Sequence, residues 1–209
     1  IELHGTPADK ITGLYEGVDP IFKPTPDPAI RAKYGLGNKP FIFSVSTIQP
    51  RKNFQRLIQA LAQLPADFNL VIAGGKGWLY DDIFAEADKP SVRGRVLFPG
   101  FVPDADLPAL YTEAAVLAYP SLYEGFGLPL LEAMACGTPT LTSTASCLPE
   151  VAGGASVLVD PYNVEAIAAG LKEAVSAPEP WVTKGLRRAA EFRWEDSARQ
   201  LIALYQALS

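Results

Sequence analysis

Several residue types that support common enzyme chemistries are scarce in this chain. Its 209 residues include two cysteines, one histidine and one methionine. The single histidine, His4, lies outside every glycine-rich loop, so the sequence offers no histidine general base and no His/Cys metal site. Cys136 and Cys147 are not spaced as Cys-x-x-Cys and fall in segments expected to be near the core, which favours a reducing compartment. We therefore expect neither a metal nor a cofactor.

Long apolar runs and an excess of positive charge are also missing. The sequence has no run of about 18 apolar residues, so it predicts no membrane-spanning helix. Its net charge of −5 provides no overall basic field to attract nucleic acid. With 48% hydrophobic and 20% charged residues, the chain has the material for one sizeable core, and one large domain is expected.

Short β-rich runs alternate with amphipathic runs along most of the chain. The strands are predicted at 41–47, 69–73, 95–98, 115–119, 138–142 and 156–159. The helices are predicted at 53–64, 80–88, 105–114, 128–136, 147–152 and 164–176. The tail from Pro180 predicts two helical runs, with a break at 194–196 and an apolar stripe on 197–208 that needs a surface to cover. Strands without clean polar alternation, interleaved with helices, indicate a doubly wound, Rossmann-like α/β domain around a parallel sheet.

The loops that follow the predicted strands hold most of the glycines and charges of interest. Right-handed crossovers place all strand-to-helix loops at one edge of a parallel sheet, which is where ligands of such folds bind. We therefore expect four loops to meet there: 48–53, 74–78, 99–104 and 120–128.

One of these loops opens a motif that indicates the chemistry. Residues 123–137, YEGFGLPLLEAMACG, place Glu124 and Glu132 around a Gly-Phe-Gly turn that leads into a helix. A helix that begins after a glycine turn presents free N–H groups and a positive dipole end, which suit a phosphate. Carboxylates accept hydrogen bonds from sugar hydroxyls. The motif therefore predicts a ligand with phosphate and polyol groups, such as a nucleotide sugar.

Five ordered motifs carry a family resemblance over residues 10–208. PRKN at 50–53, IAGGKGW at 72–78, FPGFV at 98–102, the run YEGFGLPLLEAMACGTP at 123–139 and LPEV at 148–151 resemble the donor-binding, C-terminal half of GT-B retaining glycosyltransferases. They are most similar to the "group 1" family, family 4, and in particular to mannosyltransferases. The resemblance implies that 1–20 form the hinge and the end of a missing N-terminal domain. It also implies that 21–193 form the donor domain and that 194–209 form a helix crossing back.

The resemblance also implies roles for individual residues. Lys52 matches the lysine that contacts the donor diphosphate, and Glu124 matches the glutamate beside the transferred hexose, so these two are the expected catalytic residues. Arg51 either assists Lys52 or faces solvent. Glu132 matches the residue that binds the ribose hydroxyls, so its replacement should weaken nucleotide binding, whereas replacement of Glu124 should weaken only nucleotide-sugar binding. Backbone N–H groups for the sugar and diphosphate are expected from Gly125, Phe126, Gly127 and Leu128.

The nucleotide base is expected between the third-strand loop and the turn at Gly74 and Gly75. Val102 matches a position whose backbone contacts the base. Asp104 either accepts two hydrogen bonds from a guanine edge or caps the helix beginning near Asp106. The guanine interpretation favours GDP-mannose as donor, with a UDP-glucose-type donor as the alternative.

The expected reaction is metal-independent hexose transfer, with retention of configuration, to a glycan or lipid-linked acceptor held by the missing domain. The expected location is the cytoplasm, with peripheral association at the inner membrane face through that domain. Alone, this chain is expected to bind nucleotide weakly and to transfer nothing. Many relatives carry a Gly-Arg dipeptide where this chain has Ser46-Thr47, which leaves open a binding or regulatory module without transfer activity. A GT-B epimerase is a further alternative, although its acid and base groups would have to come from the missing half.

Overall fold

The domain is built on one parallel sheet. The structure, a computed structural model, describes residues 5–207. Within this range the sheet has six strands in the order β3-β2-β1-β4-β5-β6, and every neighbouring pair is parallel. The strands are β1 (Phe41–Val45), β2 (Asn69–Ala73), β3 (Val96–Gly100), β4 (Val116–Tyr119), β5 (Thr140–Ser143) and β6 (Val157–Val159). This order is that of a doubly wound nucleotide-binding fold, so the predicted fold class is confirmed.

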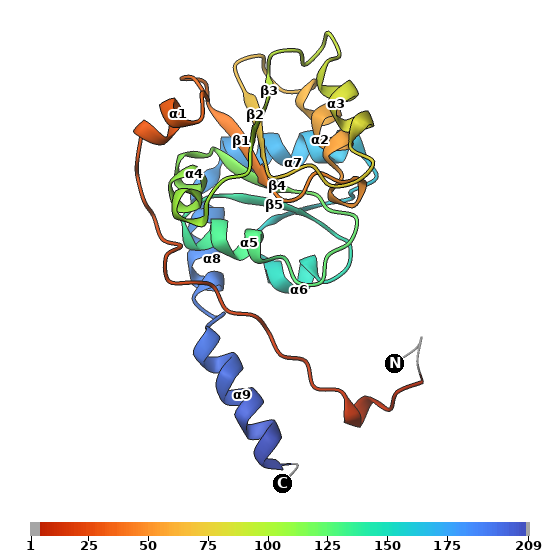
Figure 1. The fold of residues 1–209 in the computed structure, drawn as a ribbon, viewed down its shortest axis with the longest axis vertical. Coiled ribbons are helices and arrows are strands. Elements are labelled where there is room, and N and C mark those ends of the chain that lie inside the picture. Colours follow the sequence, from red (N-terminus) through yellow and green to blue (C-terminus); the bar gives the residue numbers. More distant parts are fainter. Residues whose placement is uncertain (1–4, 208–209) are drawn as a thin grey trace.

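Helices cover both faces of the sheet (Figure 1). On one face pack α2 (Phe54–Leu61), α3 (Asp81–Ala87) and α7 (Val164–Ser176). On the other pack α1 (Ala29–Lys33), α4 (Leu107–Glu113), α5 (Leu128–Ala135) and α6 (Leu148–Ala152), and α8 (Pro178–Ala189) packs on α5. Short 3-10 turns lie at Ala8–Lys10, Pro50–Lys52 and Asp104–Asp106. The two layers explain why the strands are apolar on both sides.

Helix α2 illustrates how the apolar spacing of the sequence becomes packing. Phe54, Leu57, Ile58 and Leu61 are each at most 1% exposed. Their spacing places them on one face of the helix, against the sheet. Burial of each such side chain is worth about 1.5–3 kcal/mol relative to an exposed one. This face fixes the position of the helix and therefore of the loop that precedes it.

The predicted break at 194–196 is wrong. Helix α9 (Trp194–Ala207) begins at Trp194, and the chain between α8 and α9 turns at 190–193. Glu195 and Asp196 lie in the first turn of α9, where negative charge favours the helix dipole. The two acids therefore mark the start of a helix rather than an interruption.

The N-terminal segment and the start of α9 lie against each other. The Val18 N–H donates to the Phe192 carbonyl at 3.0 Å, and the Ser197 hydroxyl donates to the Tyr15 carbonyl. From there α9 extends away from the domain (Figure 1), and none of its described residues is buried. The expectation that residues 1–20 form the hinge and the end of another domain falls partly outside the described residues, at 1–4. The proposed domain boundaries remain predictions.

Among residues 5–207, no helix combines the length and apolarity needed to cross a bilayer.

Gly74 is expected to be required for the fold where β2 ends. Its φ of +139° disfavours any side chain, and a Cβ there would lie 1.9 Å from the Ser46 carbonyl oxygen. Gly74→Ala should therefore lower the free energy of unfolding by about 2 kcal/mol or more, measured by urea denaturation. The control is Gly75→Ala, because a Cβ at Gly75 would meet no described atom within 4 Å. Equal stability of the two variants would contradict this account.

Candidate functional site

The site lies where the strand order reverses. Strands β1 and β4 are neighbours. After β1 the chain continues to β2 on one side of this pair, and after β4 it continues to β5 on the other side. In such folds the loops that follow the two strands diverge and form a crevice between them. These loops are joined by a hydrogen bond of 2.9 Å from the Leu122 N–H to the Arg51 carbonyl. The loops after β2 and β3 adjoin them through bonds from Ile48 to Gly75 (2.9 Å) and from Gly74 to Gly100 (2.7 Å). The predicted meeting of four loops at one edge is confirmed.

Two cations and one carboxylate form the centre of the site. The Lys52 Nζ donates to Glu124 Oε1 at 2.7 Å and to the Tyr119 hydroxyl at 2.9 Å. Arg51 donates to Glu124 Oε2 at 2.7 Å and to the Tyr123 carbonyl. Lys52 and Glu124 are only 8% and 7% exposed. The structure therefore brings the two predicted catalytic residues into direct contact and pairs Arg51 with Glu124, while the Arg51 side chain stays 38% exposed.

Burial and pairing oppose each other in this cluster. Burial lowers the pKa of the Lys52 ammonium, against the effect of its hydrogen bond to Glu124. Burial would raise the pKa of the Glu124 carboxyl, but the hydrogen bonds it accepts, from Lys52 and Arg51 among others, and the charge of Lys52 together outweigh burial, and the pKa lies below its usual value. Glu124 is thus ionised at neutral pH. One carboxylate balances two cations, and the cluster keeps a net positive charge that suits an anionic ligand.

The glycine turn lies directly beside this cluster. Helix α5 begins after Gly127, whose φ is +108° and whose Cβ would lie 2.9 Å from the Leu148 side chain. Within the described residues no side chain caps α5. Pro129 has no N–H and the Leu130 N–H donates to the Gly127 carbonyl at 3.0 Å, so the Leu128 N–H is the group of this first turn that faces a ligand. The Cys147 thiol holds the turn through contacts to the carbonyls of Glu124 (3.3 Å) and Phe126 (3.2 Å).

A cavity of about 450 Å³ opens along this turn. Its walls come from the N-terminal segment, the end of β4 and the start of α5: Leu14, Glu16, Tyr119, Glu124, Gly125, Phe126, Gly127, Leu128 and Pro129. The Phe126 ring packs against Tyr15 and Phe192, so its side chain supports the wall. The predicted donor residues 124–128 all line this one cavity.

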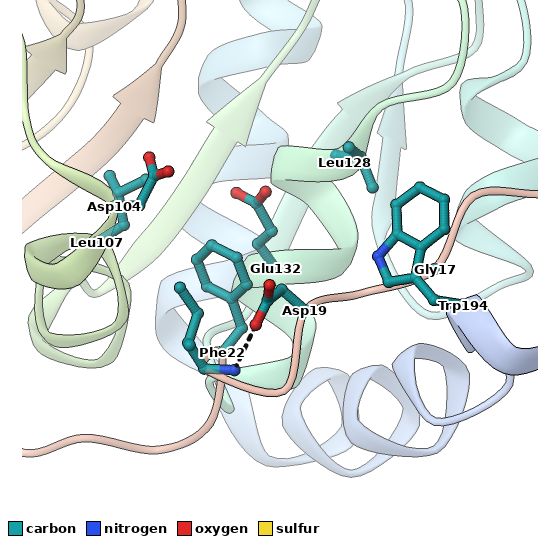
Figure 2. Close-up of a pocket in the computed structure, with 9 residues that line it drawn as sticks. Gly17, Asp19, Phe22, Asp104, Leu107, Leu128, Glu132 and Trp194 are labelled. Atoms are coloured by element: carbon teal, nitrogen blue, oxygen red, sulfur yellow. Dashed lines mark hydrogen bonds between the residues drawn. The ribbon is translucent and has the colours of Figure 1, made fainter.

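A second cavity of about 240 Å³ adjoins the first at Leu128, which lines both. Figure 2 shows the side chains of this second cavity. Its walls are Gly17, Asp19, Ile21, Phe22, Asp104, Leu107, Leu128, Glu132 and Trp194. Glu132 and Asp104 therefore face one space, while Glu124 faces the other.

Glu132 is held as a weakened acid in this second cavity. The Tyr111 hydroxyl donates to Glu132 Oε2 at 2.7 Å. Burial raises the pKa of the carboxyl to about 7, and the nearby charges of Asp104 and Asp19 add to this effect. Glu132 therefore exchanges its proton near neutral pH.

This raised pKa predicts a pH-dependent stability. Between the ordinary value of 4.5 and about 7, the folded protein binds more protons at Glu132 than the unfolded chain does. The stabilisation is therefore complete below pH 4.5 and is lost as pH rises through 7. Glu132→Gln cannot ionise and should not show this loss. The difference in free energy of unfolding between the variant and the unmodified protein should therefore shift in favour of the variant by on the order of 2 kcal/mol from pH 5 to pH 8. Urea denaturation across this range tests it, and a pH-independent difference would contradict it.

Asp104 does not cap a helix, which corrects one of its two predicted roles. Position 106, not 104, precedes α4, and no described side chain caps that helix. Asp106 instead pairs with Lys33 at 2.6 Å and accepts a hydrogen bond from the Tyr34 hydroxyl. Asp104 is left facing the cavity beside Glu132.

In the described part of the chain, no group of three His, Cys, Asp or Glu side chains is arranged to hold a metal ion.

The other predicted base-binding residues lie apart from the two cavities. Gly74 and Gly75 line neither of them, and Gly74 is tied directly to Gly100. The Val102 side chain is buried in the core, which leaves only its backbone for a ligand. The roles of Gly74, Gly75 and Val102 toward a base remain predictions.

Sequence reasoning missed several residues of the site. Tyr119 binds Lys52, Tyr111 binds Glu132, and Asp19 and Trp194 line the second cavity. Tyr119 had a recognisable signal, because a polar group at the carboxyl end of a central strand faces the crevice. Asp19 and Trp194 had none, because only the folded chain brings the N-terminal segment and α9 to this position.

Comparisons with known proteins identify the family to which this chain is similar. Residues 26–205 match the family model described as glycosyl transferases group 1. The chain is 37% identical over 220 residues to the O-antigen chain mannosyltransferase B of Escherichia coli, covering 100% of this chain and 57% of that protein. It is 34% identical over 211 residues to a D-inositol 3-phosphate glycosyltransferase of Segniliparus rotundus, covering 95% and 47%. The chain thus spans about half the length of these relatives.

Solved structures share the fold. HepE of Anabaena, in complex with UDP-glucose, aligns with a TM-score of 0.86 at 23% identity, over 97% of this chain and 59% of that one. Sucrose-phosphate synthase from Thermosynechococcus elongatus aligns with a TM-score of 0.81 at 29% identity, over 92% and 51%. The C-terminal domain of LpcC from Francisella tularensis aligns with a TM-score of 0.69 at 22% identity, over 84% of this chain and 97% of that domain.

Proposed function

This chain belongs to the glycosyl transferases group 1 family, and from that premise we propose that it binds a nucleotide-sugar donor and stabilises the diphosphate that departs when the sugar is transferred. One observation carries the proposal. The net positive cluster of Arg51, Lys52 and Glu124 lies at the reversal point of the sheet, beside the uncapped start of α5. Cations and helix N–H groups then act on the same anionic ligand from two sides.

The expected chemical step is electrostatic. As the bond between sugar and phosphate breaks, the diphosphate gains negative charge, and fixed positive groups lower the energy of that transition state. Lys52 donates two of its three N–H bonds within the protein, so one remains for the leaving group. The proposal assigns no step to a metal or a cofactor, and the retention of configuration is the outcome that the family resemblance implies.

We favour a mannose donor with a guanine base. The mannosyltransferase relatives support the sugar, and Asp104, which faces the Glu132 cavity without capping a helix, supports the base. A UDP-glucose-type donor is the alternative, because HepE was crystallised with UDP-glucose.

The acceptor, in this proposal, is a glycan or lipid-linked sugar held by a second domain outside this chain. The exposed apolar residues of α9, including Leu201 and Ile202, and the adjacent N-terminal segment give such a domain a place to pack. We place the protein in the cytoplasm, with association at the inner membrane face through that domain. The alternative of a binding module without transfer activity depends on Ser46-Thr47, whose side chains add no cation to the cluster.

Calorimetric titration of the chain with GDP, UDP and ADP tests the proposal. We expect GDP to bind most tightly and manganese or magnesium to be unnecessary. If UDP bound at least about tenfold more tightly, a gap of about 1.4 kcal/mol, the guanine assignment would be wrong. If none of the three bound, the proposed function itself would fail. Sugar transfer by this chain alone would contradict the assignment of the acceptor to another domain.

A further inference from the structure

We propose that Tyr119 is a positioning residue, whose hydroxyl aims the Lys52 ammonium at the diphosphate of the donor. The inference rests on the proposed function of Lys52. Its geometric basis is that the Tyr119 hydroxyl accepts a hydrogen bond of 2.9 Å from Lys52 Nζ while the same residue lines the cavity of the glycine turn. Tyr119 thus connects the buried cation with the space that the ligand would occupy.

The position of Tyr119 is fixed from several directions. It is the last residue of β4, next to the centre of the sheet, and is 4% exposed. Its carbonyl accepts a hydrogen bond of 2.9 Å from the Thr142 hydroxyl, and β5 pairs with it at this point. Its ring also lies near the cation, with Lys52 Nζ 5.1 Å from the ring centroid. A side chain on a central strand is a rigid support, unlike the loops on either side.

Lysine needs such a support more than arginine does. Its ammonium sits on a flexible four-carbon stem and has no fixed donor geometry of its own. Glu124, the other acceptor of Lys52, is shared with Arg51 and sits in a loop. With Glu124 as the sole acceptor, the ammonium would be free to turn about that one contact. Two acceptors from different elements leave a single N–H, in a defined direction.

The hydroxyl also supports the charge of Lys52. The charged and titratable groups that face the ammonium are Glu124 from the loop after β4, Arg51 from its own turn and Tyr119 from β4. Burial already lowers the pKa of Lys52. Loss of one acceptor would lower that pKa further, because the neutral amine needs the acceptor less than the ammonium does. The effect of removing the hydroxyl should therefore grow as pH rises.

The test is Tyr119→Phe, which keeps the ring and removes only the hydroxyl. Calorimetric titration with GDP at pH 7 should show binding weakened by about three- to tenfold relative to the unmodified chain. The fold loss of GDP affinity caused by Tyr119→Phe should be larger at pH 9 than at pH 7. Tyr162→Phe is the matched control, because that side chain is exposed and lies outside both cavities, and it should bind GDP as the unmodified chain does.

A double-mutant cycle separates positioning from a merely structural role. In a Lys52→Met background, Tyr119→Phe should change GDP binding by less than about twofold, because the group that it positions is gone. If Lys52→Met binds GDP too weakly to measure, the test rests on the affinity ratio between the unmodified chain and Tyr119→Phe, compared at pH 7 and pH 9. Equal GDP affinity of Tyr119→Phe and the unmodified chain, or a loss that is the same at both pH values, would overturn the role of Tyr119. Absence of GDP binding by the unmodified chain would instead overturn the proposed function.

Discussion

Replacement of Glu124 by alanine is expected to lower the free energy of unfolding by about 3–5 kcal/mol. The variant leaves Lys52 buried without its carboxylate partner, and Arg51 loses its ion pair with the same carboxylate. An unpaired buried charge costs far more than the loss of an exposed ion pair. Urea denaturation at neutral pH, with unfolding followed by circular dichroism, measures the change.

Glu191→Ala is the matched control for this experiment. Glu191 also pairs with an arginine, Arg188, but its side chain is 59% exposed. Its removal should cost less than about 1 kcal/mol. If the two variants were equally stable, the Glu124 pair would contribute no more than a surface contact, and the cluster would not hold Lys52 in place.

The same contact changes how Glu124 can be tested as a sugar ligand. The family resemblance implies that its replacement would spare plain nucleotide and weaken only the nucleotide sugar. Because Glu124 also orients Lys52, the alanine variant should affect both ligands. Glu124→Gln keeps the side-chain shape and an acceptor oxygen, so it is the better variant for comparing GDP with GDP-mannose.

Replacement of Lys52 by methionine is expected to weaken GDP binding by about 10- to 100-fold, which corresponds to the loss of one charge-assisted hydrogen bond. Methionine retains much of the length and apolar character of the side chain, and Glu124 keeps Arg51 as a partner, so the fold should survive. Guanosine, which has no phosphate, should bind the variant and the unmodified chain equally. Calorimetric titration with both ligands measures this difference.

Lys76→Met provides the control for Lys52→Met. Lys76 lies in the loop after β2, at the same edge of the sheet, but its ammonium is 5.0 Å from the ring centroids of Tyr80 and Phe84, outside the cluster. Its replacement should leave GDP binding within about twofold, since a solvent-screened charge contributes little at a distance. An equal loss in both variants would mean that the net charge of this edge, rather than the Lys52 contact, determines affinity.

Regular elements were predictable because their signals are local. The apolar spacing of 53–64 predicted α2, and the β-rich runs predicted the strands. The spacing of apolar residues along the sequence indicates the type of element and the face that it buries. The errors arose where a local pattern has two outcomes. The acids at 195 and 196 fit a break as well as a helix start, and the structure places them in the first turn of α9. Asp104 fits a cap as well as a cavity wall, and the structure places it in the cavity wall.

The sequence by itself determined the fold and the loops that meet at the candidate site. Backbone requirements of the glycine turn, together with the rule that loops after parallel strands share one edge, were enough to bring Lys52, Glu124 and Glu132 to that edge. Only the tertiary structure decided which of these groups are partners. Lys52 meets Tyr119 and Glu124 across 67 and 72 residues of sequence, and such contacts depend on strand order and burial rather than on any local pattern. That pairing makes Glu124 the counter-ion of the cation it was predicted to accompany, and makes a tyrosine of the sheet part of the site.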